Sequence, residues 1–114
     1  MKRIKTIAIF LLLINAAAFA QNKKDIKTET FKVSGNCEMC KKTIESSLDT
    51  RGVKEAVWDV KTGILKVTYN EKKIQPGAIY KKVSEAGYDS EKMKADDKAY
   101  AALPECCKYS RKNK

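Results

Sequence analysis

Apolar positions along the central part of this chain follow two periods, one of two residues and one of about four, in regular succession. Alternation over residues 30–34 predicts a strand, and apolar residues at every fourth position predict a helix from about residue 38 to 49. Two more alternating runs, residues 53–60 and 64–70, are separated by three residues that end in glycine. That spacing predicts a hairpin whose turn needs a positive φ.

The second half of the pattern adds a helix and a weaker strand. Pro76 suits the first turn of a helix that ends at Gly87. Residues 88–95 alternate less clearly and predict a short last strand with Met93 and Ala95 on its inner face. The order strand, helix, strand, strand, helix, strand predicts an α+β fold of the ferredoxin-like βαββαβ type. Its four-stranded antiparallel sheet would carry two helices on one face.

The two ends of the chain differ from this domain in character. Residues 1–20 have a basic start, an apolar run and an Ala-Phe-Ala cleavage signal, so we expect a signal peptide and export across an inner membrane, to the periplasm. The apolar run is short for a spanning helix, which needs about 20 residues, so an uncleaved anchor is the less favoured alternative. Residues 21–29 are polar and predict a flexible leader. Residues 96–114 form a cysteine-containing tail that begins with a short helix capped by Asp96.

Charge and composition narrow the function. The chain has 114 residues and a net charge of +10, yet its lysines are scattered among glutamates and accompany no aromatic cluster. We therefore expect no nucleic-acid partner, and membrane contact only through the signal segment or weak surface charge. The sequence contains no histidine, so a metal site has to rest on sulfur, carboxylate or carbonyl groups. A single small domain of this kind is expected to be a monomer.

Four cysteines carry the candidate chemistry: Cys37, Cys40, Cys106 and Cys107. The first two stand three positions apart where a strand gives way to a helix, and the unpaired N–H groups of a helix N-terminus favour thiolates. Thiolates are soft metal ligands and also nucleophiles. The pair by itself therefore indicates either a metal site or disulfide exchange. The tail pair can join it, form a disulfide with Cys37 or Cys40, or remain independent.

Several short motifs, in a fixed order along the chain, resemble those of a known family. They are Val33-Ser34-Gly35 before the cysteines, the CxxC pair, Gly52-Val53 before the second strand, Thr62-Gly63 in the hairpin and Glu85-Ala86-Gly87-Tyr88 after the second helix. With these motifs, residues 30–95 resemble the heavy-metal-associated domain of copper chaperones, metal-pumping ATPases and periplasmic mercury-binding proteins. The loop is one residue shorter than is usual in that family, because only Asn36 separates Gly35 from Cys37.

The resemblance implies a soft-metal-binding protein without enzyme activity, a carrier, chaperone or scavenger whose metal is held by Cys37 and Cys40. Two thiolates suit Cu(I), our first expectation, as well as Hg(II) and Ag(I). Zn(II) and Cd(II) prefer about four ligands, which Cys106 and Cys107 could complete. The expected partner is a metal-transporting membrane protein or another metal-carrying domain. The alternative is a periplasmic thiol–disulfide oxidoreductase with Cys37 as nucleophile and Cys40 as resolving thiol.

Overall fold

The computed structural model describes residues 22–111, so the expected signal peptide, residues 1–20, and the last three residues lie outside the described part. Within that part, no helix combines the length and the apolar character needed to cross a bilayer. The elements in chain order are η1 (Asn22–Asp25), β1 (Ile26–Lys32), α2 (Glu38–Ser47), β2 (Val53–Trp58), β3 (Ile64–Asn70), α3 (Pro76–Glu85), α4 (Asp97–Ala101) and η2 (Glu105–Cys107).

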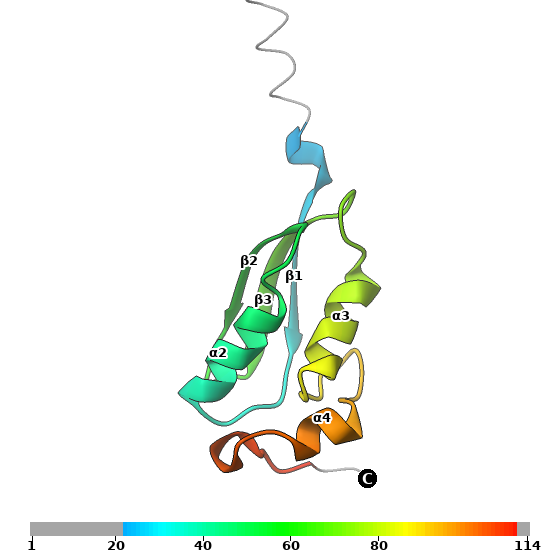
Figure 1. Ribbon diagram of the computed structural model, residues 1–114. Coiled ribbons are helices and arrows are strands. Elements are labelled where there is room, and N and C mark those ends of the chain that lie inside the picture. The colour runs from blue at the N-terminus through cyan, green and yellow to red at the C-terminus, as the bar shows by residue number, and fades with distance from the viewer. Residues whose placement is uncertain (1–21, 112–114) are drawn as a thin grey trace, which may run out of the picture.

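A three-stranded antiparallel sheet in the order β1-β3-β2 forms one layer, and α2 and α3 lie on the same face of it (Figure 1). The predicted hairpin is confirmed, since β2 and β3 pair and Gly63 has a φ of 76°. The four-residue period is confirmed as well, because Cys40, Ile44 and Leu48 on α2 are all buried. Ile79 and Val83 on α3 complete the core between helices and sheet.

The predicted fourth strand does not form as an element. Residues 88–95 form one isolated bridge, Ser90 with Val33 directly after β1, and then turn on themselves. The Ser90 N–H donates to Met93 O at 3.0 Å, and the Asp89 carboxylate accepts the Ala95 N–H at 2.7 Å. These local bonds occupy groups that a ladder would need, so the strand is replaced by a turn. Ala95 is buried as expected, whereas Met93 is exposed.

The first strand begins earlier than the alternation indicates. Residues 26–29, which we expected in a flexible leader, belong to β1, where Ile26 pairs with Asn70 and Thr28 with Thr68. Their side chains are mostly not buried, so the backbone ladder with β3 holds them in place. The second strand ends at Trp58, before the predicted Val60, because the Gly63 N–H donates to Asp59 O and closes the turn there.

The C-terminal tail crosses one end of the molecule. Figure 1 shows α4 and the segment after it lying beneath the loop that joins β1 to α2, at the end of the molecule opposite η1. Asp96 caps α4 as predicted, accepting the Ala99 N–H at 3.0 Å. Gly87, with a φ of 102°, lies directly against this tail, since a Cβ there would come within 2.9 Å of Ala99 O.

Candidate metal centre

The loop before the first cysteine is tied down by backbone hydrogen bonds. The Val33 N–H donates to Gly63 O, and the Ser34 N–H donates to Asp89 O, both at 2.8 Å. Gly35 then lies against the ring of Trp58, where a Cβ would come within 2.8 Å of Cζ2. A side chain at Gly35 would therefore push the loop away from the indole, and glycine is required for this close approach.

Trp58 supports this loop from the core. It is fully buried at the end of β2, and its indole N–H donates to the carbonyl oxygens of both Val33 and Gly63 at 3.1 Å. Trp58 belongs to the alternating run 53–60, a pattern that predicts a strand but does not connect the indole with the thiol loop. The indole gives this short loop an inward anchor.

The first two thiols meet at the start of α2. Cys37 is the N-cap residue with an extended backbone, and Cys40 lies in the first helical turn. Their Sγ atoms are 3.3 Å apart. Asn36 brackets the inner thiol, because the Cys40 thiol donates to Asn36 Oδ1 at 3.2 Å and the Asn36 N–H donates to Cys40 Sγ at 3.5 Å. Both sulfurs are therefore presented at one helix N-terminus.

The tail brings a third sulfur to the same point. Cys107 Sγ lies 3.8 Å from Cys37 Sγ, and the Sγ atoms of Cys37, Cys40 and Cys107 all lie within 4.8 Å of one another. Cys40 and Cys107 are fully buried, while Cys37 is partly exposed. We call Cys37, Cys40 and Cys107 the three-sulfur cluster.

Tyr109 and Arg111, which follow Cys107, hold the tail in this position. The Tyr109 hydroxyl donates to Gly87 O and accepts the Asp89 N–H, both at 2.8 Å. The Arg111 guanidinium donates to the two carboxylate oxygens of Asp89 at 2.9 Å and to Asp97 at 3.0 Å. Because Tyr109 and Arg111 follow Cys107 so closely, they determine where its sulfur can lie.

The cluster has the dimensions of a metal site. With metal–sulfur bonds of about 2.3 Å, sulfurs around one ion are about 3.8 Å apart in a tetrahedron, about 4.0 Å in a trigonal plane and about 4.6 Å in a linear pair. The Cys37–Cys107 distance of 3.8 Å matches the first two, and the Cys37–Cys40 distance of 3.3 Å lies closer to them than to a linear pair. Small side-chain adjustments would let all three sulfurs contact one soft ion.

The thiols differ in how readily they lose a proton. Burial acts to raise the pKa of Cys37, but the Cys40 N–H and the thiols of Cys40 and Cys107 outweigh it, so this pKa lies below its ordinary value. This direction agrees with the predicted effect of a helix N-terminus. Burial raises the pKa of Cys107 to about 12, and the neighbouring Cys40 thiol acts the same way. A metal ion would therefore meet Cys37 first and would have to displace the proton of Cys107.

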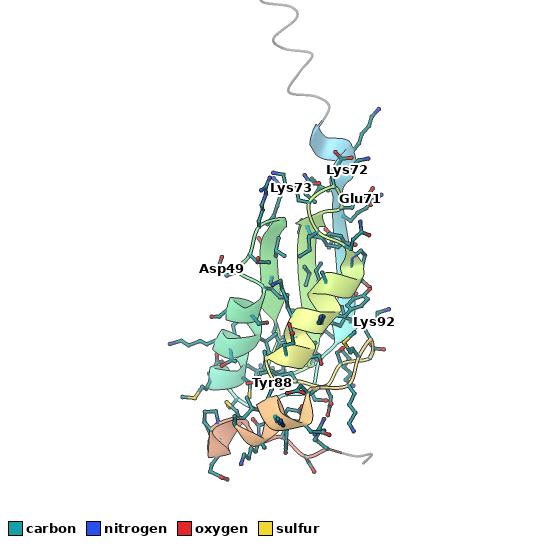
Figure 2. The ribbon with its side chains drawn as sticks, turned by 45° about the vertical axis from the view of Figure 1, so that its right-hand side comes forward. Asp49, Glu71, Lys72, Lys73, Tyr88 and Lys92 are labelled. Atoms are coloured by element: carbon teal, nitrogen blue, oxygen red, sulfur yellow. The ribbon has the colours of Figure 1, made fainter. Side chains whose placement is uncertain are left out.

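Tyr88 closes the inner side of the cluster. It is fully buried, and Figure 2 shows it between the main layers and the tail. Burial is the main cause that raises the pKa of Tyr88, and charge at Cys40 and Cys107 adds to the effect. Within residues 22–111 its hydroxyl has no hydrogen-bond partner. A buried hydroxyl in this position is available to donate to a thiolate once a metal ion has removed the thiol protons.

Cys106 is the one predicted ligand that lies outside the three-sulfur cluster. It is exposed, and its thiol donates to the sulfur of Met39 at 3.6 Å. Its own Sγ is 4.0 Å from Cys107 Sγ. Met39, which lies between the two converging cysteines, is 49% exposed.

The sequence signals for the tail contacts were weak. Tyr109 and Arg111 lie in a short polar segment whose pattern indicates no element, and Asp89 lies in the predicted fourth strand. The contacts of Tyr109 and Arg111 with Asp89 form only when segments distant in the sequence pack together. The only local sign that this segment packs is that a tyrosine and an arginine, Tyr109 and Arg111, follow Cys106-Cys107 closely.

Comparison with known proteins identifies a protein family whose sequence pattern this chain matches. The sequence profile described as the heavy-metal-associated domain matches residues 30–89, more than half of the chain. The matched part contains Cys37 and Cys40, whereas Cys106 and Cys107 lie beyond it.

Individual relatives agree with that match. The chain is 40% identical over 65 residues to a zinc-transporting ATPase of Synechocystis sp., covering 55% of this chain and 9% of that much longer protein. The solved structure of the CopZ metallochaperone is 29% identical with a TM-score of 0.54, covering 56% of this chain and 98% of that one. Oxidized MerP from Ralstonia metallidurans CH34 is 26% identical with a TM-score of 0.55, covering 58% and 94%.

Proposed function

Because this chain belongs to the heavy-metal-associated domain family, we propose that it is an exported carrier of a soft metal ion, chiefly Cu(I), and not an enzyme. It would bind the ion in the periplasm and hand it to a metal-transporting membrane protein or another metal-carrying domain. Similarity to a metallochaperone and to the matching region of a transporting ATPase supports a role in metal traffic.

The observation that carries this proposal is the convergence of three thiols from two distant segments. Cys37 and Cys40 come from the loop and helix start, and Cys107 comes from the tail 70 positions away from Cys37. A single buried thiol packs like any small apolar group, but packing does not require three sulfurs to converge within 4.8 Å of one another. They are well suited to a thiophilic ion.

Three sulfurs also bear on which ion is held. Cu(I) is satisfied by two or three thiolates, whereas Zn(II) and Cd(II) would need a fourth ligand, from water, from a partner or from Cys106. Hg(II) and Ag(I) share the preference for sulfur. We therefore propose Cu(I) as the principal cargo, with Zn(II), Cd(II), Hg(II) and Ag(I) as the competitors to be measured.

A competition titration tests the proposal. Reduced protein is titrated with Cu(I) against a coloured Cu(I) chelator, and X-ray absorption counts the sulfur ligands. Wild type should bind one ion with three sulfurs. The Cys37→Ser/Cys40→Ser double variant should lose specific binding, and Cys107→Ser should bind at least about tenfold more weakly, equal to about 1.4 kcal/mol, with two protein sulfurs.

Cys106→Ser is the matched control, because it removes the neighbouring thiol outside the cluster and should leave affinity and sulfur count unchanged. Equal Cu(I) affinity in wild type and in the Cys37→Ser/Cys40→Ser variant would refute the carrier role. Native mass spectrometry of protein from metal-supplemented cells would identify the ion and would show whether residues 1–20 have been removed.

One observation favours a second candidate, a thiol–disulfide oxidoreductase. The Cys37 and Cys40 sulfurs are 3.3 Å apart, and the lowered pKa of Cys37 suits a nucleophile. Insulin reduction by the reduced protein would support it if the rate exceeds the glutathione background and is lost in Cys37→Ser. We favour the carrier, because Cys107 and Tyr88 enclose the pair that a protein disulfide would have to reach.

A further inference from the structure

An exposed pair of sulfurs stands next to the three-sulfur cluster. Met39 Sδ, from the first turn of α2, and Cys106 Sγ, from η2, are 3.6 Å apart. Met39 is 49% exposed, and Cys106 is also exposed. Single exposed apolar side chains are common on protein surfaces, so the exposure of Met39 alone indicates nothing. Its distinguishing feature is that its thioether sulfur lies against a thiol.

The cluster itself is closed on most sides. Cys40 and Cys107 have no exposed surface, and Tyr88 lies on the inner side with its buried, unpartnered hydroxyl. The partly exposed Cys37 thiol donates to the carbonyl oxygen of Cys106 at 3.2 Å, so η2 lies over it. Cys37 is the cluster cysteine that keeps exposed surface, and Cys106 and Met39 are exposed beside it, so this is the side from which a partner's ligand would approach an ion in the cluster.

We propose that Cys106 and Met39 form an outer two-sulfur site through which a soft ion passes into and out of the three-sulfur cluster. This inference rests on the proposed function and adds the route of exchange to it. A separation of 3.6 Å lets both sulfurs contact one ion through bonds of about 2.3 Å. One thiolate and one thioether bind a soft ion more weakly than three thiolates, so the outer site passes the ion on.

The step is ligand exchange without a change of oxidation state. Cys107 Sγ lies 4.0 Å from Cys106 Sγ and 3.8 Å from Cys37 Sγ, so adjacent sulfurs form a continuous path. The ion first binds Met39 and Cys106, whose thiol proton leaves to solvent. As the ion moves inward, bonds to Cys107, Cys37 and Cys40 form and each of these thiols releases its proton to solvent. The bonds to Met39 and Cys106 break, and the freed Cys106 thiolate takes a proton back from solvent. Release to a partner thiol reverses the order.

Exchange kinetics test this assignment. The purified full chain loaded with one Cu(I) is mixed with excess bicinchoninate, and release is followed by the colour of the chelator complex. Cys106→Ser and Met39→Leu should each slow release several-fold, while competition titration gives an unchanged equilibrium affinity. Met93→Leu is the matched control, since Met93 is similarly exposed, at 38%, on the turn after α3, and it should leave the rate unchanged.

The double variant Cys106→Ser/Met39→Leu decides whether the two sulfurs act together. If they form one site, it should be no slower than the slower single variant, whereas independent effects would multiply. An unchanged release rate in both single variants overturns the outer site and leaves the carrier function intact. A drop in affinity in Cys106→Ser as large as that in Cys107→Ser would make Cys106 a ligand of the central site instead. Absence of Cu(I) binding by wild type would overturn both proposals.

Discussion

At the scale of single residues, Cys37 and Cys107 are placed in opposite electrostatic situations although their sulfurs are 3.8 Å apart. The N-cap position and neighbouring donors lower the pKa of Cys37 despite burial, whereas burial raises the pKa of Cys107 to about 12. Reactivity of a thiol follows its thiolate fraction and its access. The helix start predicted a favoured thiolate for the CxxC pair, whereas the burial of Cys107 could not be predicted from the sequence.

This difference predicts an order of alkylation. In the reduced, metal-free chain, iodoacetamide should modify Cys37 increasingly as pH rises, with a midpoint below the ordinary thiol value of 9.0, because its folded-state pKa is lowered. Cys107 should stay the least modified thiol up to about pH 9, because its pKa is about 12 and it is buried. Peptide mapping by mass spectrometry measures both. Equal labelling of the two in the folded chain would contradict the geometry, and labelling in urea serves as the control.

At the scale of elements, the tail is held by contacts that follow its cysteines. The Arg111 and Asp89 side chains are mostly buried and share two hydrogen bonds, and Tyr109 is bonded to Gly87 and Asp89. Hydrogen bonding to Arg111 is the main cause that lowers the pKa of Asp89. The tail is therefore an attached part of the domain, and Cys107 owes its position to Asp89, which our sequence analysis placed in a strand.

Loss of this ion pair should release the tail. Arg111→Gln leaves the Asp89 carboxylate without its charged donor, so we expect tail docking to weaken by about 2 kcal/mol, the usual range for hydrogen bonds to charged groups. Cys107 should then become open to alkylation, and Cu(I) affinity should fall. Lys108→Gln is the control, because the pairing of Lys108 with the highly exposed Glu105 at 3.6 Å contributes little. Unchanged Cys107 labelling in Arg111→Gln would contradict this role.

The same pair sets a pH dependence. Because the folded-state pKa of Asp89 is depressed below 3.8, its contribution to docking is fully present above that value and is lost as pH falls through the folded pKa. Cysteine accessibility or hydrogen exchange in the tail, followed from neutral pH downward, should therefore rise only in acid. The Asp89→Asn variant should show weaker docking already at neutral pH and a flatter acid profile.

At the scale of the whole molecule, the sulfurs and η1 lie at opposite ends. Figure 2 shows Lys72 and Lys73 at the end far from Tyr88, and the Glu71 N–H donates to Asp25 O, so η1 lies at that basic end as well. The strands between them are seven residues long in β1 and β3, roughly 23 Å at about 3.3 Å per residue.

Metal binding should stabilise the whole chain by joining its distant segments. An ion held by Cys37, Cys40 and Cys107 links positions 70 residues apart, and binding to the folded state alone adds about 4 kcal/mol when free metal exceeds Kd by about 1,000-fold. Cu(I) should therefore raise the unfolding midpoint and slow hydrogen exchange in α4 and η2. Cys107→Ser should keep a smaller shift and lose the protection in the tail. Equal tail protection in that variant would show that the ion does not engage Cys107.

The sequence by itself determined the parts that depend on local periodicity and on short motifs. The α2 stripe, the β2–β3 hairpin, the positive φ at Gly63, the Asp96 cap and the CxxC pair at a helix start all follow from neighbours in the chain. The family followed from the same motifs and is confirmed. The alternation over residues 88–95 also predicted a fourth strand. That prediction is wrong, because the Asp89 carboxylate accepts the Ala95 N–H and the segment turns.

Tertiary structure decided which sulfurs meet. Whether Cys106, Cys107 or neither reaches Cys37 depends on where Tyr109 and Arg111 find partners on the segment after α3, a contact between residues about twenty positions apart. It also depends on Trp58 supporting the loop from another strand. Adjacent cysteines on a short helical turn point in different directions, so Cys107 enters the cluster and Cys106 stays at the surface. No local pattern encodes that choice, because it is made by packing between segments that are distant in sequence.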